Sequence, residues 1–435
     1  MISNSSDEPG NEAEQANADS RAEDGAVLTP GQLAEAQRYA RLDLICDLTT
    51  RVVDLTFLVV LAFVLGGPHG WLMQHVPATQ SIHHAPRDVG KPHAEREEYY
   101  QGAGTPETLR LGVLYLLIAA LNMAIDFPLS FYGGFVLEHQ FGMSQLSLGR
   151  WLWRYAKGQA LQLVFGLLLL VGLYWLIWTT GTWWWLTAAV AVFAVAIVSG
   201  QLMPVLIMPL FYKIARLDDA ELAQRMQRLA EGTGLSIEGV YRMNLSTETV
   251  KANAMLAGLG PTRRVILGDT LLDNFTPDEI EVILAHEVGH HVHRHIYRMI
   301  VLGAVFCAAG FWACDAVLTL WIRATDPALI TPGGSIDYTQ FPVYALPMMM
   351  LVLSLFSTLL EPLTNAISRH HERQCDRYAL TRTGKAEAYR TAFRKLAGLN
   401  KDDPAPNSVA VMLFHSHPPI SERLAMAEGA EGAKG

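Results

Sequence analysis

The chain has 435 residues, of which 51% are hydrophobic and 17% are charged, and its formal net charge is −9. Soluble globular proteins are about 25% charged, so this composition argues against a soluble enzyme and against a disordered chain. The acidic balance lacks the basic excess that nucleic-acid binding needs, so no nucleic-acid partner is expected. The four cysteines form no CxxC pair, and no disulfide framework is expected.

The chain begins with a polar, acidic stretch. Residues 1–25 hold seven acidic side chains against one basic side chain, Arg21, and few apolar ones. This composition predicts a solvated, disordered tail over residues 1–32. Residues 33–50 then have the pattern of an amphipathic helix that leads into the first apolar run.

Six apolar segments approach or reach the roughly 20 residues that a helix needs to cross a bilayer. Tryptophans near their ends, such as Trp71, Trp183 and Trp321, favour membrane spans over buried core helices. We therefore predict a multi-pass α-helical membrane protein. Its N-terminal membrane domain covers residues 33–212 with four spans, and a transmembrane hairpin covers residues 299–362. The six segments are approximately 52–72, 109–130, 159–178, 183–208, 299–322 and 341–362.

Lys and Arg gather at alternate ends of these spans. Arg150, Arg154 and Lys157 follow the second span, whereas the connection at residues 179–182 has no basic residue. The positive-inside rule then puts both termini and the two polar segments, 209–298 and 363–435, on the cytoplasmic face of the membrane.

The two polar segments are predicted to form one small α+β unit from residues 213–298 and 363–426, followed by a tail at 427–435. Asp218 is a candidate N-cap of an amphipathic helix, and Thr276 with Glu279 forms a capping box that starts a helix running to about residue 295. Short strands are expected at residues 238–244, 252–257 and 263–267.

The helix after the capping box contains the sequence His286-Glu287-Val288-Gly289-His290, an HExxH motif. At 100° per residue the two histidines lie on one face, one turn apart, as two zinc ligands must. Glu287 is placed to take a proton from the metal's water. The alternative is a charged face of a histidine-rich helix, since His291, His293 and His295 follow.

A catalytic zinc site needs a third protein ligand. Glu372 is the candidate, and Asp376 lies one turn further along the same predicted helix. Asp376 could accept the free ring N–H of a ligand histidine. From spacing alone, these two carboxylates could equally be solvated charges beside Arg369 and Arg373.

With these motifs, the sequence resembles the type I CAAX prenyl endopeptidases, which are membrane zinc metallopeptidases, and their bacterial relatives. The resemblance runs from about residue 35 to residue 426. It includes Phe127-Pro128-Leu129-Ser130, Val136 to Gly142, Met208-Pro209-Leu210-Phe211, Asn253-Ala254, Asp269 to Leu272, the HExxH helix, Ser368-Arg369 with Glu372 and Asp376, and His417-Pro418-Pro419 with Glu422-Arg423.

The resemblance implies one zinc ion per chain on His286, His290 and Glu372 in a gluzincin-like unit. It implies Glu287 as general base and Asp376 as the partner of a ligand histidine. It also implies that His417 and Arg423 lie near the reacting carbonyl, and that Asn253 and Ala254 hold a peptide or protein substrate, hydrophobic or lipidated, on an edge strand.

Two features depart from that family. Eukaryotic members have a further N-terminal span where this chain has its acidic tail. Cys375 stands where the family has a small alanine, three residues from Glu372. To bind zinc, this thiol would have to displace one of the three ligands that the resemblance implies.

Two other functions remain open from the sequence. A quality-control protease for damaged membrane proteins would have the same motifs as a processing enzyme. Asn122, Asp126 and Asp315 lie within apolar spans, where polar groups suggest a transporter, a channel or an intramembrane cavity, unless they pair with other groups in a solid bundle.

Overall fold

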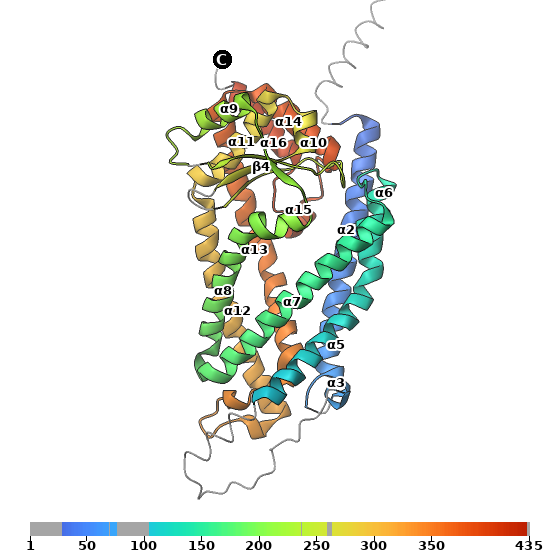
Figure 1. Ribbon diagram of the computed structural model, residues 1–435, viewed down its shortest axis with the longest axis vertical. Helices are drawn as coiled ribbons and strands as arrows, with labels where there is room; N and C mark the ends of the chain where they lie inside the picture. Colours follow the sequence, from blue (N-terminus) through green and yellow to red (C-terminus); the bar gives the residue numbers. More distant parts are fainter. Residues whose placement is uncertain (1–27, 69, 76–103, 236, 259–262, 433–435) are drawn as a thin grey trace, which may run out of the picture.

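The computed structural model describes residues 28–68, 70–75, 104–235, 237–258 and 263–432. Long helices extend from one end of the molecule, and a sheet with shorter helices forms a head at the other end (Figure 1). We call the residues of this sheet and of the helices packed on it the head unit. The predicted acidic tail lies almost wholly outside the described residues.

The long helices account for all six predicted spans. Five stretches are long and apolar enough to cross a membrane, and one of them, Leu148–Leu210, holds two helices that reverse direction at Gly181. Large apolar side chains such as Val164, Leu168 and Leu359 are exposed on these helices, as expected of surfaces that face lipid. The multi-pass fold is thus confirmed. The helices are α2 (Pro30–Val60), α5 (Gly104–Phe131), α7 (Leu148–Thr180), α8 (Trp184–Leu202), α12 (His295–Thr325) and α13 (Leu346–Thr383).

Short helical pieces join or extend the spans. The π-helical turns are η1 (Leu61–Leu65), η3 (Tyr132–Leu137) and η5 (Met203–Ile207), and the short α-helices are α3 (Trp71–His75) and α6 (Glu138–Gln140). The 3₁₀ turns are η4 (Gly181–Trp183), η6 (Met208–Leu210), η8 (Pro327–Leu329), η9 (Tyr338–Gln340) and η10 (Val343–Ala345).

The first span differs from its prediction because α2 is one continuous helix that begins much earlier. Thr29 caps it, and Gln32 completes a capping box. With η1 the helix has 36 residues, about 54 Å at 1.5 Å per residue, well beyond the roughly 30 Å of a hydrocarbon core. Its first turns therefore leave the membrane, and Leu28 and Ala36 are buried in the core of the head unit.

Two of the three polar side chains within the spans have polar partners. Asp315 accepts hydrogen bonds from Trp184 Nε1 and Tyr338 Oη, both at 2.6 Å. Asn122 donates to Asp54 at 3.3 Å. One oxygen of Asp126 is buried without a hydrogen bond among the described residues. Pairing within the bundle thus explains two of these residues without a cavity.

The head unit is built on a four-stranded sheet in the order β1-β2-β4-β3. The parallel pair β2 and β4 lies at the centre, and antiparallel neighbours flank it. The three predicted strands are present, whereas β1, which has only three residues, was not predicted. The strands are β1 (Ile214–Arg216), β2 (Gly239–Met243), β3 (Ala254–Ala257) and β4 (Arg264–Gly268).

Shorter helices complete the head unit, among which α15 packs on α13. They are α9 (Ala220–Ala230), α10 (Asp269–Asn274), α11 (Pro277–Val292), α14 (Ala386–Asn400), α15 (Ser408–Phe414) and α16 (Ile420–Gly432). Asp219, not Asp218, caps α9, because its carboxylate accepts from the Leu222 N–H at 2.9 Å. The predicted capping box of Thr276 and Glu279 is confirmed. The helix that it starts ends at Val292, because Arg294 adopts a left-handed conformation before α12 begins.

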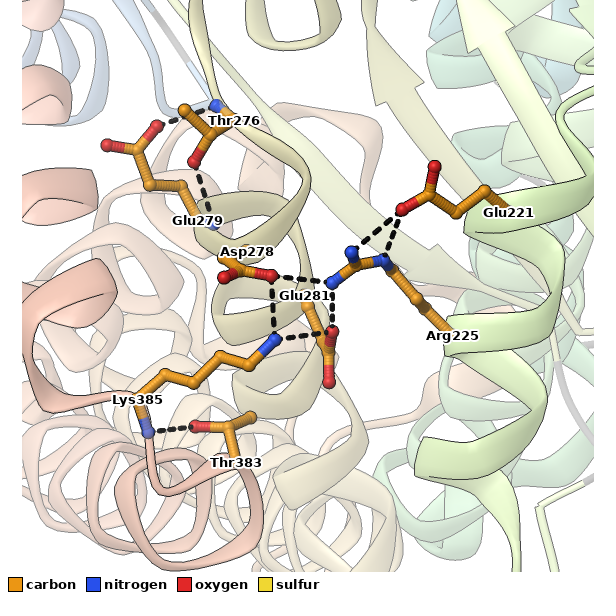
Figure 2. Close-up of polar contacts among 8 residues, drawn as sticks. All are labelled: Glu221, Arg225, Thr276, Asp278, Glu279, Glu281, Thr383 and Lys385. Carbon is orange, nitrogen blue, oxygen red and sulfur yellow. Dashed lines mark hydrogen bonds and ion pairs between the residues drawn. The ribbon is translucent and has the colours of Figure 1, made fainter.

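A network of ion pairs ties three elements of the head unit together (Figure 2). Arg225 of α9 contacts Asp278 and Glu281 of α11, each at 2.6 Å. Lys385, just before α14, contacts the same two carboxylates at 2.7 and 2.9 Å. Two cations thus share two anions, and α11 is held from both sides.

Candidate active site

The predicted metal ligands come from α11 and α13, which pack closely against each other. Gly289 makes this possible: a Cβ atom there would lie only 3.0 Å from the Cα atom of Cys375. The close approach brings the face of α11 that carries the two histidines of the HExxH motif against Glu372. The two polar segments, which the transmembrane hairpin separates in the chain, therefore meet at one site through their described residues.

The imidazoles of His286 and His290 both direct Nε2 at the carboxylate of Glu372. The distances are 3.1 Å from His286 to Oε2 and 3.3 Å from His290 to Oε1. Two ligands that bind one tetrahedral zinc with bonds of 2.0–2.1 Å lie about 3.4 Å apart. The three side chains thus have the spacing of a shared ion.

Glu372 gives a further test of whether a cation fits here. The residue is 4% exposed, and its Oε2 atom makes no hydrogen bond among the described residues. A buried carboxylate oxygen without a hydrogen bond is costly. A divalent cation held by this oxygen and the two Nε2 atoms would satisfy it, so the residues fit the group.

Asp376 lies directly behind the first histidine of the motif, His286. Its fully buried carboxylate lies 2.9 Å from His286 Nδ1, which leaves Nε2 free to face a metal. Arg423 binds the same carboxylate through two nitrogens, at 2.5 and 3.0 Å. Burial alone lowers the pKa of Arg423, but the charge of Asp376 outweighs burial and raises that pKa, so the pair is ionic.

Glu287 lies between the histidines and the edge of the sheet. The backbone N–H of Leu256 in β3 donates to its carboxylate, and the side chain is partly exposed. Burial raises the pKa of Glu287 despite the two neighbouring imidazoles. A carboxylate with a raised pKa is a better proton acceptor near neutral pH.

Strand β3 is at the edge of the sheet and has a free side. The Gly268 N–H bonds to the Asn253 carbonyl at 2.9 Å, and the antiparallel register pairs Ala254 with Leu267. The alternation of antiparallel bonding then turns the backbone groups of Ala254 and Leu256 away from β4. The N–H and carbonyl of Ala254 and the carbonyl of Leu256 can pair with an extended peptide, whereas the Leu256 N–H already donates to Glu287.

His417 and Arg423, both predicted near the reacting carbonyl, lie in different surroundings. The His417 side chain is 62% exposed, and its Nε2 atom is 3.7 Å from Glu372. Arg423 is buried on Asp376 and lies 3.9 Å from Glu372. His417 thus faces the open side of the site, whereas Arg423 lies behind it.

Cys375 also lies close to both histidines, with one candidate ligand atom from each residue within 4.8 Å. Its Sγ atom is 3.6 Å from His295 Nδ1, and that atom is 3.3 Å from His290 Nδ1. The thiol thus contacts His295, whereas the Glu372 carboxylate faces the Nε2 atoms of both motif histidines. This geometry favours Glu372 as the third ligand.

The neighbouring histidines have other partners. His291 contacts Arg263. His295 is 2% exposed, approaches Gln374 at 2.8 Å and stacks on His371 with ring centroids 4.0 Å apart. The place of His295 beside the His290 ring was not predicted, because the packing of α12 against α13 is not visible in the spacing.

A helix-borne HExxH motif facing a buried glutamate, in a chain of long apolar helices, defines an integral membrane metallopeptidase. The family model described as "Peptidase family M48" matches residues 216–431. The model "CAAX prenyl protease N-terminal, five membrane helices" matches residues 21–213. The chain belongs to peptidase family M48, and it is a multi-pass membrane metalloprotease that acts on peptide or protein substrates.

Known proteins resemble the chain over most of its length. An uncharacterized metalloprotease, YhfN, of Bacillus subtilis is 27% identical over 95% of this chain and 89% of its own. CAAX prenyl protease 1 of Saccharomyces cerevisiae is 29% identical over 71% of this chain and 70% of its own. The crystal structure of S. mikatae Ste24p matches the fold with a TM-score of 0.75 at 22% identity, covering 93% of this chain and 90% of that one.

Proposed function

We propose that the protein is a zinc endopeptidase that cuts hydrophobic or lipidated peptides at the cytoplasmic face of its membrane. The observation that supports this most strongly is the convergence of His286, His290 and the unsatisfied Glu372 oxygen on one point beside Glu287. One zinc per chain on these three ligands leaves a fourth position open, as catalysis requires. The family membership implies a metal ion as well.

The reaction is hydrolysis of a peptide bond by water. Zinc, when bound, supplies a Lewis acid that polarises the scissile carbonyl and lowers the pKa of its water. Glu287 accepts the proton of the attacking water and returns it to the leaving amine. His417, on the open side of the site, donates a hydrogen bond to the developing oxyanion, which contributes roughly 3 kcal/mol for a well-placed donor.

Arg423 has a positioning role in this scheme. It neutralises Asp376, which fixes the ring of His286 through Nδ1. Its place near the reacting carbonyl, which the family resemblance implies, stays a prediction. Asn253 and Ala254 begin the free edge of β3, and a substrate strand there gains main-chain hydrogen bonds with little demand on its sequence.

The substrate class rests on two observations. Several relatives of similar length are named CAAX prenyl proteases, which links this family to processing of peptides with a CAAX end. The membrane helices also place the head unit next to lipid, where a hydrophobic peptide is concentrated. A quality-control protease for damaged membrane proteins is the alternative within the same chemistry. A transporter or a channel is no longer an alternative, because the chain is a metalloprotease.

The orientation is proposed from the positive-inside rule. Single cysteines introduced near residues 250 and 400 should be labelled from the cytoplasmic side by a reagent that cannot cross the membrane. A cysteine near residue 330 should be labelled from the other side. Labelling of all three from one side would contradict the topology.

The decisive experiment separates metal binding from chemistry. Purified Glu287→Gln should keep about one zinc per chain by elemental analysis, while cleavage of any peptide that the wild type cuts falls by orders of magnitude. Glu372→Ala should lose most of its zinc. Glu221→Gln, an equivalent change at a side chain that is 64% exposed, is the matched control and should retain both zinc and activity.

Two results would contradict the proposal. Near-normal turnover of Glu287→Gln would remove its role as general base. Full zinc in Glu372→Ala would remove this residue from the ligand set. A comparison of a farnesylated peptide with its unmodified twin then tests the substrate class, since equal cleavage of the two leaves the quality-control alternative.

A further inference from the structure

A cavity of about 750 Å³ lies between the start of α12 and the adjoining part of α13, apart from the metal site. Two stripes of side chains line it. On the α12 side, Arg294 lies just before the helix, and Arg298, Val301, Leu302 and Val305 follow at the three- and four-residue spacing of one helix face. On the α13 side, His371 lies one turn from Ile367. The cavity is therefore basic at one end and apolar at the other.

The two arginines have no side-chain partner in the part of the chain that the structure describes. Among the described residues neither makes an ion pair or a side-chain hydrogen bond, and both are exposed. Arg377 on α13 is a third exposed arginine without an ion pair among the described residues. It lies near the other two in space, since the charges of Arg298 and Arg377 both lower the pKa of His293. The cavity is thus bordered by positive charge that no described side chain balances.

The position of the cavity relative to the membrane follows from the chain. Helix α12 leaves the head unit at His295, three residues after the last residue of α11, and its later part is a candidate span. Val301 and Val305 are 65% and 58% exposed. Figure 1 shows α12 and α13 leaving the head unit together. The basic end therefore lies where the spans emerge from the bilayer, and the apolar end lies within it.

We propose that this cavity binds one anionic phospholipid. Its phosphate would lie on Arg294 and Arg298, and its acyl chains would run along Val301, Leu302, Val305 and Ile367. Arginine is suited to phosphate because its planar guanidinium can donate two parallel hydrogen bonds. The stripe from Arg298 to Val305 is about 10 Å long, which matches the glycerol region and first carbons of an acyl chain. The volume lies within the usual range for small-ligand sites.

The bound lipid would also touch the surroundings of the metal site. His371 is 7% exposed, lines the cavity and directly precedes Glu372. Its ring stacks on His295, whose Nδ1 atom lies 3.3 Å from His290 Nδ1. The headgroup is thus separated from a predicted zinc ligand by two stacked rings. The proposal itself concerns binding and does not depend on the peptidase reaction.

The test uses the full-length protein in nanodiscs or detergent with phosphatidylglycerol as the probe, and native mass spectrometry as the readout. Wild type should retain one phosphatidylglycerol in preference to phosphatidylcholine. Arg294→Gln/Arg298→Gln should weaken retention by about 25-fold, which is about fivefold for each arginine. Leu302→Trp, which fills the apolar end, should reduce retention while leaving both charges in place.

Arg150→Gln is the matched control, because Arg150 is an exposed arginine near the head-side end of another span and has no ion pair among the described residues. It should bind phosphatidylglycerol as the wild type does. Size-exclusion chromatography and unchanged thermal stability show that each variant is folded. For a double variant that fails this check, Arg298→Gln alone, with an expected fivefold loss, decides the question.

Four outcomes would overturn the proposal. Equal retention of phosphatidylcholine would remove the headgroup's role. An equal loss in Arg150→Gln would indicate general surface attraction. Displacement of the lipid by millimolar glycerol phosphate would make the cavity a site for free phosphate. Displacement by a farnesylated peptide, but not by its unmodified twin, would make it part of the substrate path.

Discussion

The ion pair of Asp376 and Arg423 gives the sharpest quantitative prediction. Asp376→Asn keeps the shape of the side chain but leaves the guanidinium of Arg423, 7% exposed, without its closest anion. Breaking a buried pair from one side costs about 3–5 kcal/mol. The lower end applies here, since Glu372 lies 3.9 Å from the same guanidinium and Phe393 lies 3.9 Å below it.

The expected loss of about 3 kcal/mol corresponds to a fall in Tm of roughly 6–12 °C for a unit of this size. In a background in which the partly exposed Cys46 and Cys307 are replaced by alanine, a thiol-reactive dye measures it in detergent, because Cys375 is fully buried and reacts only on unfolding. Excess EDTA in the assay removes any contribution from metal binding. In separate titrations Asp376→Asn should bind zinc 10- to 100-fold more weakly, because His286 loses the charged partner of its Nδ1 atom.

A double-mutant cycle tests the reasoning behind these numbers. Arg423→Met should destabilise by a similar amount, because it leaves Asp376 buried and charged. Asp376→Asn/Arg423→Met should cost less than the sum of the two single changes by at least about 2 kcal/mol. If the three losses are additive within about 0.5 kcal/mol, the two side chains are not coupled and the buried pair does not hold the site together.

Two further predictions concern α11. Thr276→Ala removes its N-cap and should lower the free energy of unfolding by about 1 kcal/mol, with Thr276→Ser restoring it; an unchanged Tm would contradict the role of the cap. Lys385 and Arg225 lower the pKa of Asp278, and they also lower that of Glu281 against the opposing effect of burial. The stabilisation that these ionised carboxylates contribute is fully present above their ordinary pKa of about 4. It is lost as the pH falls through their lowered pKa values in the folded protein. Wild-type Tm should therefore fall more steeply than that of Glu281→Gln between pH 5 and pH 3, and parallel curves would contradict this linkage.

Local signals in the sequence were enough to predict most of the architecture. The spans follow from long apolar runs, and the start of α11 follows from Thr276 and Glu279, because a capping box acts within four residues. The strands β2, β3 and β4 were found from short apolar segments. Strand β1 was missed, since three residues carry no periodic signal, and the end of α11 depends on the left-handed conformation of Arg294.

The candidate site was harder to predict from spacing, because its parts are far apart in the chain. HExxH is a local motif and was recognised directly. Glu372 was a candidate from its place in the chain, but spacing left solvated charge equally open, and the family resemblance decided between the two. The meeting of α11 and α13 depends on packing around Gly289. The placement of Arg423 on Asp376 also depends on tertiary structure, as does the burial of Leu28 from the start of α2 in the head unit.

Helix α13 has no loop between its apolar part and Glu372, and this has a mechanical consequence. The helix is continuous from Leu346 to Thr383 and contains Pro362, a residue that bends helices. From there to Glu372 the arm is ten residues, about 15 Å. A swing of 2° moves the carboxylate by about 0.5 Å, more than the roughly 0.2 Å tolerance of a metal bond. A spanning helix that is longer than the local bilayer is thick can tilt to fit it, so the thickness of the surrounding membrane can change the alignment of the predicted third ligand.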